Sequence, residues 1–121
     1  MKKILLIDDE ESVRYAISRY LKKSGFDVIA LEDGFKVDRT LEAIDIDIII
    51  TDLIMPNVEG LEIIQKLKEK FPSLPIIAIS GGGRNMDISI LEYAGIFGAD
   101  VTLPKPINEE KLVQHIKELT V

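Results

Sequence analysis

The chain has no cysteine and no tryptophan, and only 6% of its 121 residues are aromatic. Without cysteine it can form neither a disulfide framework nor a thiolate metal site, which suits a reducing compartment. Positive charge is also scarce, because 15 lysines and arginines face 21 aspartates and glutamates, for a formal net charge of −6. Nucleic acids and anionic membranes bind clustered cationic side chains, so this balance disfavours both as partners.

Long hydrophobic runs are missing as well. Lys2-Lys3 followed by residues 4–7 imitates the start of a signal peptide, but Asp8-Asp9 ends the apolar run far short of an h-region. No other apolar run approaches membrane-spanning length. We therefore expect one domain, residues 1–121, in a cytoplasmic protein, with a hydrophobic core large enough to be stable without disulfide bonds.

Strand-like and helix-like segments alternate along the whole chain. This alternation is typical of βα units and a parallel sheet, and it predicts the α/β class. The third strand is four β-formers in a row, which indicates burial on both faces of the sheet. The five strands are expected at residues 3–7, 27–31, 48–51, 75–79 and 100–103.

Apolar residues at helical spacing follow each strand. Gly25 is a natural stop for the first helix, and Asn108 a natural cap for the last. The fourth helix, expected near residues 86–96, is unusually apolar. The expected inward faces are Val13, Ala16, Ile17, Tyr20 and Leu21 in the first helix, Phe35, Val37, Leu41 and Ile44 in the second, Ile64, Leu67 and Phe71 in the third, and Leu112, Ile116 and Leu119 in the last.

Four of the five predicted strands lead into a polar or charged side chain. Asp8-Asp9 follow the first strand, and Asp52, Ser80 and Lys105 come after the third, fourth and fifth. Right-handed crossovers put all carboxyl ends of a parallel sheet at one edge, so these groups are expected to converge. Open α/β sheets bind their ligands at that edge.

The chemistry of these groups points to one kind of site. Clustered carboxylates repel one another, so the cluster either takes up protons or binds a divalent cation. An all-oxygen cluster selects a hard ion such as Mg²⁺, which is suited to bridging phosphate oxygens. Lys105 would supply a positive charge for a phosphoryl group, and Ser80 a hydroxyl donor. The sequence thus predicts a site for Mg²⁺ and a phosphoryl group, with an aspartate as the nucleophile.

The ordered set of these motifs resembles the receiver domain of two-component response regulators, and the match covers the whole chain. The resemblance implies a flavodoxin-like (βα)5 fold, a doubly wound five-stranded parallel sheet with strand order 2-1-3-4-5. The motifs are Asp8-Asp9, Asp52-Leu53-Ile54-Met55-Pro56 with Gly60 nearby, Ser80, Gly98-Ala99-Asp100, and Lys105-Pro106.

The resemblance also implies a role for each site residue. Asp52 would be the phosphoacceptor, and Asp9, Asp52 and the backbone carbonyl of Ile54 would bind Mg²⁺ directly. Asp8 would act mostly through a metal-bound water. Ser80 and Lys105 would hold the phosphoryl group and start the conformational switch.

Partners follow from the same resemblance. The donor would be a phosphohistidine on a sensor histidine kinase or a histidine phosphotransfer protein. The receiver would catalyse only its own phosphorylation and dephosphorylation, as a monomer or weak dimer. A stand-alone receiver would signal to a separate effector protein through its surface from the fourth to the fifth helix.

Three features depart from the family pattern. Thr102 stands where the family usually has tyrosine or phenylalanine, which puts the usual route of the switch in doubt. The span from Ser80 to Lys105 is about three residues longer than expected, a margin comparable to the uncertainty of element boundaries. Ile107 replaces a frequent phenylalanine, which we regard as minor.

Other functions stay open on the sequence. An aspartate-nucleophile phosphohydrolase typically has a second acid two residues after the nucleophile, where this chain has Ile54. A flavodoxin-like cofactor carrier is allowed by the architecture, although the acids would repel a flavin phosphate. A pseudo-receiver that binds partners without phosphorylation is kept open by Thr102. His115, at the edge of an inward face, is interpreted as a partly exposed surface residue.

Overall fold

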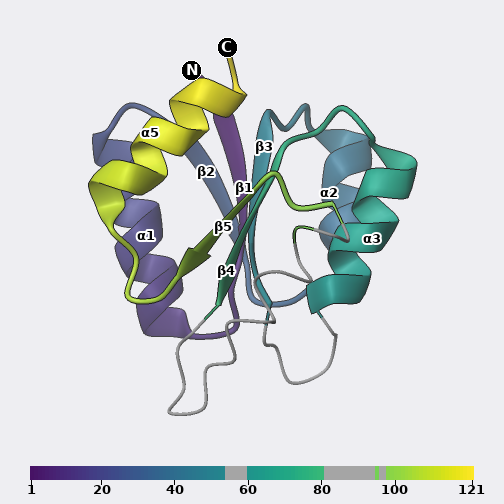
Figure 1. Ribbon diagram of the computed structural model, residues 1–121, viewed down its shortest axis with the longest axis horizontal. Coiled ribbons are helices and arrows are strands. Elements are labelled where there is room, and N and C mark those ends of the chain that lie inside the picture. Colours follow the sequence, from purple (N-terminus) through teal and green to yellow (C-terminus); the bar gives the residue numbers. More distant parts are fainter. Residues whose placement is uncertain (54–59, 81–94, 96–97) are drawn as a thin grey trace.

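The computed structural model describes residues 1–53, 60–80, 95 and 98–121 (Figure 1). Five parallel strands form one sheet in the order β2-β1-β3-β4-β5. This confirms the α/β class and the strand order that the resemblance implies. The strands are β1 (Lys3–Ile7), β2 (Asp27–Leu31), β3 (Ile48–Asp52), β4 (Ile76–Ser80) and β5 (Val101–Pro104).

Helices cover both faces of the sheet (Figure 1). On one face lie α1 (Glu11–Lys23) and α5 (Glu109–Leu119), and on the other lie α2 (Val37–Ala43) and α3 (Gly60–Lys70). Of the helix predicted at 86–96, all but Gly95 lies outside the described residues. None of the described helices is long and apolar enough to cross a membrane.

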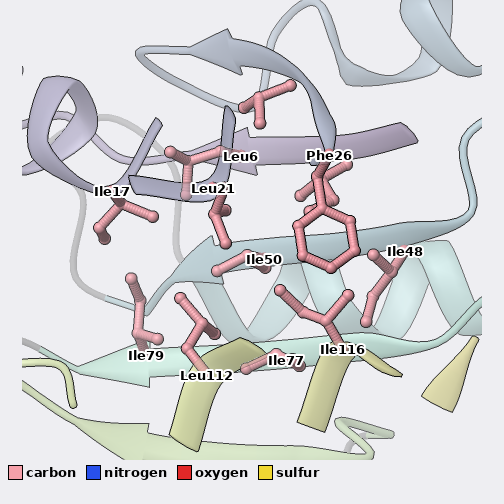
Figure 2. Packing of buried hydrophobic residues seen from close by; sticks show 12 residues of the cluster. Leu6, Ile17, Leu21, Phe26, Ile48, Ile50, Ile77, Ile79, Leu112 and Ile116 are labelled. Atoms are coloured by element: carbon pink, nitrogen blue, oxygen red, sulfur yellow. The ribbon is translucent and has the colours of Figure 1, made fainter. Parts of the chain in front are cut away.

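Each face of the sheet has its own apolar cluster. Alternate residues of a strand point to opposite faces, so Ile50 packs toward α1 and α5 while Ile49 packs toward α2 and α3. Figure 2 shows the first cluster, where Leu21 and Ile116 meet the side chains of the central strands. Every residue of β3 and β4 is buried. The polar residues at the ends of these strands therefore stand at the border of a dry core.

The predicted ends of the first and last helices are confirmed. Gly25 follows α1 with φ of 96°, a backbone conformation that residues with a side chain rarely adopt. At the other helix, the Asn108 side chain accepts a hydrogen bond from the backbone N–H of Lys111 at 3.0 Å. The fourth and fifth strands each begin and end one residue later than expected.

Two predicted inward residues are exposed. Phe35 was expected on the second helix, but its side chain is 70% exposed because α2 begins only at Val37. Phe35 belongs instead to a turn, in which its backbone N–H donates to Asp33 Oδ1 at 2.9 Å. Ala16 is also exposed, since the buried stripe of α1 is centred on Ile17 and Leu21.

Candidate functional site

The carboxyl ends of the strands meet at the lower edge of the sheet in Figure 1, away from the chain termini. The pairing register is what brings the polar residues together. Ile7 pairs with Thr51 and Asp52 pairs with Ile79, so Asp8, Asp52 and Ser80 follow one another across three adjacent strands. Ser80 in turn pairs with Pro104, which is followed by Lys105. Residues far apart in the sequence therefore reach a single site.

Three carboxylates form the centre of this site. Asp8, Asp9 and Asp52 each offer an oxygen, and these atoms lie within 4.8 Å of one another. Asp8 is fully buried, Asp52 is 2% exposed, and Asp9 is half-buried. The backbone N–H of Glu10 donates to Asp8 Oδ1 at 2.9 Å and orients that carboxylate. The predicted acidic cluster is thus present, with two of its members shielded from water.

Lys105 places its ammonium among these acids. Its Nζ lies 2.9 Å from Asp8 Oδ2 and 3.3 Å from Asp52 Oδ2. Burial by itself would lower the pKa of Lys105, but the hydrogen bond to Asp8 and the charges of Asp52 and Asp8 outweigh it, so the pKa is raised above 10.5. Lys105 is therefore charged at neutral pH, and it cancels one of the three negative charges.

Ser80 contributes a buried hydroxyl. The residue is fully buried, and within the described part of the chain its Oγ has no hydrogen-bond partner. Its backbone carbonyl accepts from the N–H of Lys105 at 2.8 Å, which ties the end of β4 to the start of the β5–α5 connection. Buried hydroxyls are normally paired, so this Oγ is suited to donate to a ligand.

The residues present fit a hard divalent cation. Only oxygen atoms are offered, and three carboxylates face the single ammonium of Lys105, which leaves the cluster suited to a further cation. Mg²⁺ takes one or two carboxylates together with waters and phosphate oxygens, and the half-buried Asp9 leaves the cluster open to water. Ile54, predicted to bind through its carbonyl, lies outside the described residues.

Two neighbours of the site were missed in the sequence. Arg14 Nη1 donates to the backbone carbonyl of Asp8 at 2.8 Å, and so fixes the peptide that joins the two acids. Thr51 donates to the backbone carbonyl of Asp52 at 3.1 Å. Neither contact with a backbone carbonyl belongs to a recognised sequence motif, and only the position of Arg14 early in the helix after Asp8-Asp9 could have indicated its role.

The structure describes two of the three positions that depart from the family pattern. Thr102 lies half-buried in β5, paired with Ala78 of β4. Ile107 packs against the cluster between the sheet and α1 and α5, as an apolar replacement would. The segment in which extra residues were expected, Gly81 to Asn85, lies outside the described residues. His115 is 32% exposed, in agreement with a surface position.

Comparisons with known proteins agree on one family. A model of the response regulator receiver domain matches residues 4–117. The chain is 33% identical, over 122 aligned residues, to the transcriptional regulatory protein CpxR of Escherichia coli K12, which covers 98% of this chain and 49% of that protein. It is 33% identical over 109 residues to a cyclic di-GMP phosphodiesterase of Thermotoga maritima, covering 90% of this chain and 28% of that protein.

A solved structure agrees in fold. The receiver domain protein from Clostridium thermocellum superposes with a TM-score of 0.89 at 29% identity, over 99% of this chain and 94% of that chain. By contrast, the chain spans at most about half the length of the two curated relatives above. The match to these curated relatives is therefore a match to part of each protein.

Proposed function

The chain belongs to the response regulator receiver family, and on this premise we propose that it is a phosphoacceptor of a two-component phosphorelay, phosphorylated at Asp52. One observation carries the proposal: the Asp52 carboxylate is almost fully buried, within reach of Asp8, Asp9 and the Lys105 ammonium. A buried carboxylate beside two others and a lysine is a charge arrangement built to receive a phosphoryl group and a cation.

The proposed reaction is a single displacement at phosphorus. An oxygen of the Asp52 carboxylate attacks the phosphorus of a phosphohistidine whose other ring nitrogen is protonated, and the P–N bond breaks. The electron pair of that bond stays on the ring nitrogen, so the histidine leaves as a neutral imidazole. An acyl phosphate remains on Asp52. Asp9, Asp52 and the carbonyl of Ile54 would hold Mg²⁺ directly, and Asp8 mostly through a metal-bound water. The bound ion would neutralise charge at the phosphoryl oxygens.

Lys105 and Ser80 would act on the product. The Lys105 ammonium, now 3.3 Å from Asp52 Oδ2, would pair with a phosphoryl oxygen. The Ser80 hydroxyl, which has no hydrogen-bond partner among the described residues, would donate to another. Moving either group would pull on the ends of β4 and β5, which are joined by the hydrogen bond between Lys105 N and Ser80 O. The proposed switch therefore starts at these two strands and reaches the surface from the fourth helix to α5, with Thr102 in the place of the usual aromatic.

The partners are part of this proposal. The donor is a sensor histidine kinase or a histidine phosphotransfer protein, and the reader is an effector that binds the surface changed by phosphorylation. The chain would act in the cytoplasm, as a monomer or weak dimer. It would catalyse only its own phosphorylation and dephosphorylation; phosphodiesterase activity belongs to the Thermotoga maritima relative, of which the chain covers 28%.

The test is phosphorylation by acetyl phosphate, followed by intact mass spectrometry. We expect the chain to gain one phosphoryl group with Mg²⁺ and none with excess chelator, and Asp52→Asn to remain unmodified. Asp45→Asn, an exposed acid at the opposite end of β3, is the matched control and should be modified like the unsubstituted chain. Full modification of Asp52→Asn, or steady turnover of phosphate esters, would replace this proposal with another function.

A further inference from the structure

Thr51 is the polar exception within the third strand. It follows three isoleucines in β3, and its side chain is fully buried. By the alternation of the strand it shares a face with Ile49, whose cluster also includes Ile7 and Ala78, the two residues that pair with Thr51. The surroundings of the Thr51 side chain are therefore apolar, and a valine of the same shape would suit them without burying a hydroxyl.

Among the described residues, the Thr51 hydroxyl has one hydrogen-bond partner. Thr51 Oγ1 donates to the backbone carbonyl oxygen of Asp52 at 3.1 Å. The N–H of the same peptide unit belongs to Leu53 and donates to the carbonyl of Ile79 at 2.9 Å. The peptide that follows Asp52 is thus held at both of its polar ends, by Thr51 on one side and by β4 on the other.

That peptide lies where the chain leaves the sheet. Asp52 is the last residue of β3, and its carboxylate must stay aligned with Lys105 Nζ, 3.3 Å away, and with the oxygens of Asp8 and Asp9. A misplacement of about 1 Å can slow a reaction that depends on alignment by about 100-fold. A restraint on the backbone of Asp52 is therefore a restraint on its carboxylate.

We propose that Thr51 is a positioning residue, whose hydroxyl fixes the Asp52–Leu53 peptide and thereby aligns the Asp52 carboxylate for phosphoryl transfer. The inference rests on the proposed function of Asp52. Thr51 touches neither the phosphoryl group nor the cation, and it acts only through the backbone of its neighbour. The hydroxyl, not the methyl group, is the part that matters for the rate.

Two substitutions separate these parts of the side chain. Thr51→Val keeps the shape and loses the hydroxyl, whereas Thr51→Ser keeps the hydroxyl and leaves a small cavity. With acetyl phosphate and saturating Mg²⁺, we expect the maximal phosphorylation rate of Thr51→Val to fall about 2- to 10-fold, the range that one hydrogen bond supports. The half-saturating concentration of acetyl phosphate should not change. Thr51→Ser should phosphorylate at a rate within about 2-fold of the unsubstituted chain, although it is less stable.

Control variants keep the result interpretable. Thr120→Val removes a hydroxyl that donates to the carbonyl of Ile116 at 2.7 Å, at the end of α5, and should leave the rate unchanged. If Thr51→Val does not fold, Thr51→Ala and Thr51→Ser provide a pair that differs only in the hydroxyl. An unchanged rate in Thr51→Val, or equal slowing in the valine and serine variants, would overturn the inference alone. No phosphorylation of the unsubstituted chain would overturn the proposed function, and the inference with it.

Discussion

Replacing Lys105 by methionine should expose how strongly this chain depends on a cation at its site. The ammonium lies 2.9 Å from Asp8 Oδ2 and 3.3 Å from Asp52 Oδ2, and its side chain is only 11% exposed. At an effective dielectric constant of about 20, each of these contacts supplies about 5 to 6 kcal/mol of attraction before desolvation is subtracted. Removing one partner of such a buried group typically lowers the free energy of unfolding by about 3 to 5 kcal/mol.

Mg²⁺ should recover part of that loss. Without the ammonium, the Asp8 and Asp52 carboxylates lose the cation that lies 2.9 and 3.3 Å from their oxygens, so Mg²⁺ is expected to bind them more tightly. Tenfold tighter binding would reduce the difference in unfolding free energy between the variant and the unsubstituted chain by about 1.4 kcal/mol at saturating Mg²⁺. The comparison therefore needs both proteins with Mg²⁺ and with chelator.

Urea unfolding at pH 7 provides the measurement. The expected result is a large loss of stability for Lys105→Met with chelator and a clearly smaller loss with Mg²⁺. Lys111→Met, which removes an exposed lysine of α5, should be nearly neutral under both conditions. A loss for Lys105→Met that is the same with and without Mg²⁺ would refute the reasoning, because the ammonium and the cation would then not share the same carboxylates.

Three further predictions concern the same residues and their surroundings. Because folding raises the pKa of Lys105, its contribution to stability should be complete below about pH 10.5, the pKa in the unfolded chain, and should decline as the pH rises through the pKa in the folded chain. Urea unfolding of the unsubstituted chain and of Lys105→Met at several alkaline pH values would reveal this decline. Ser80→Ala should change the unfolding free energy by less than about 1 kcal/mol, yet slow phosphorylation by acetyl phosphate about 10- to 100-fold. Gly98→Ala should lower the free energy of unfolding, measured with urea, by about 1 to 3 kcal/mol. The reason is that φ of Gly98 is 124° and the new Cβ would lie 2.5 Å from Lys68 Cγ. Gly95→Ala, whose new Cβ would meet no atom of the described residues within 4 Å, is its control. Equal stability of the two variants would contradict the steric argument.

The edge site was predictable because its residues follow from the strand pattern. Each buried strand ends where its apolar run meets a polar side chain, and a parallel sheet collects those ends at one edge. Asp8, Asp52, Ser80 and Lys105 could therefore be placed together from the sequence. The distances between these side chains could not be predicted, because they depend on the pairing register and on rotamers that only the packed core determines.

The errors have local causes. Phe35 has the spacing of an inward helical residue, but the turn made by Asp33 delays the start of α2, and turn hydrogen bonds compete with helix formation. The side chain of Ala16 has too little apolar surface to determine which face of α1 packs against the sheet. Arg14 and Thr51 bind backbone carbonyls, and the direction of a carbonyl is a property of the folded chain and not of a residue type.

Locating the acyl phosphate tests the central claim most directly. After treatment with acetyl phosphate and Mg²⁺, borohydride converts a phosphorylated aspartate to homoserine, which peptide mass spectrometry can assign to a position. The account predicts homoserine at position 52 alone, and none when Mg²⁺ is removed. Homoserine at Asp8, at Asp9 or at a surface acid, with Asp52 intact, would contradict it.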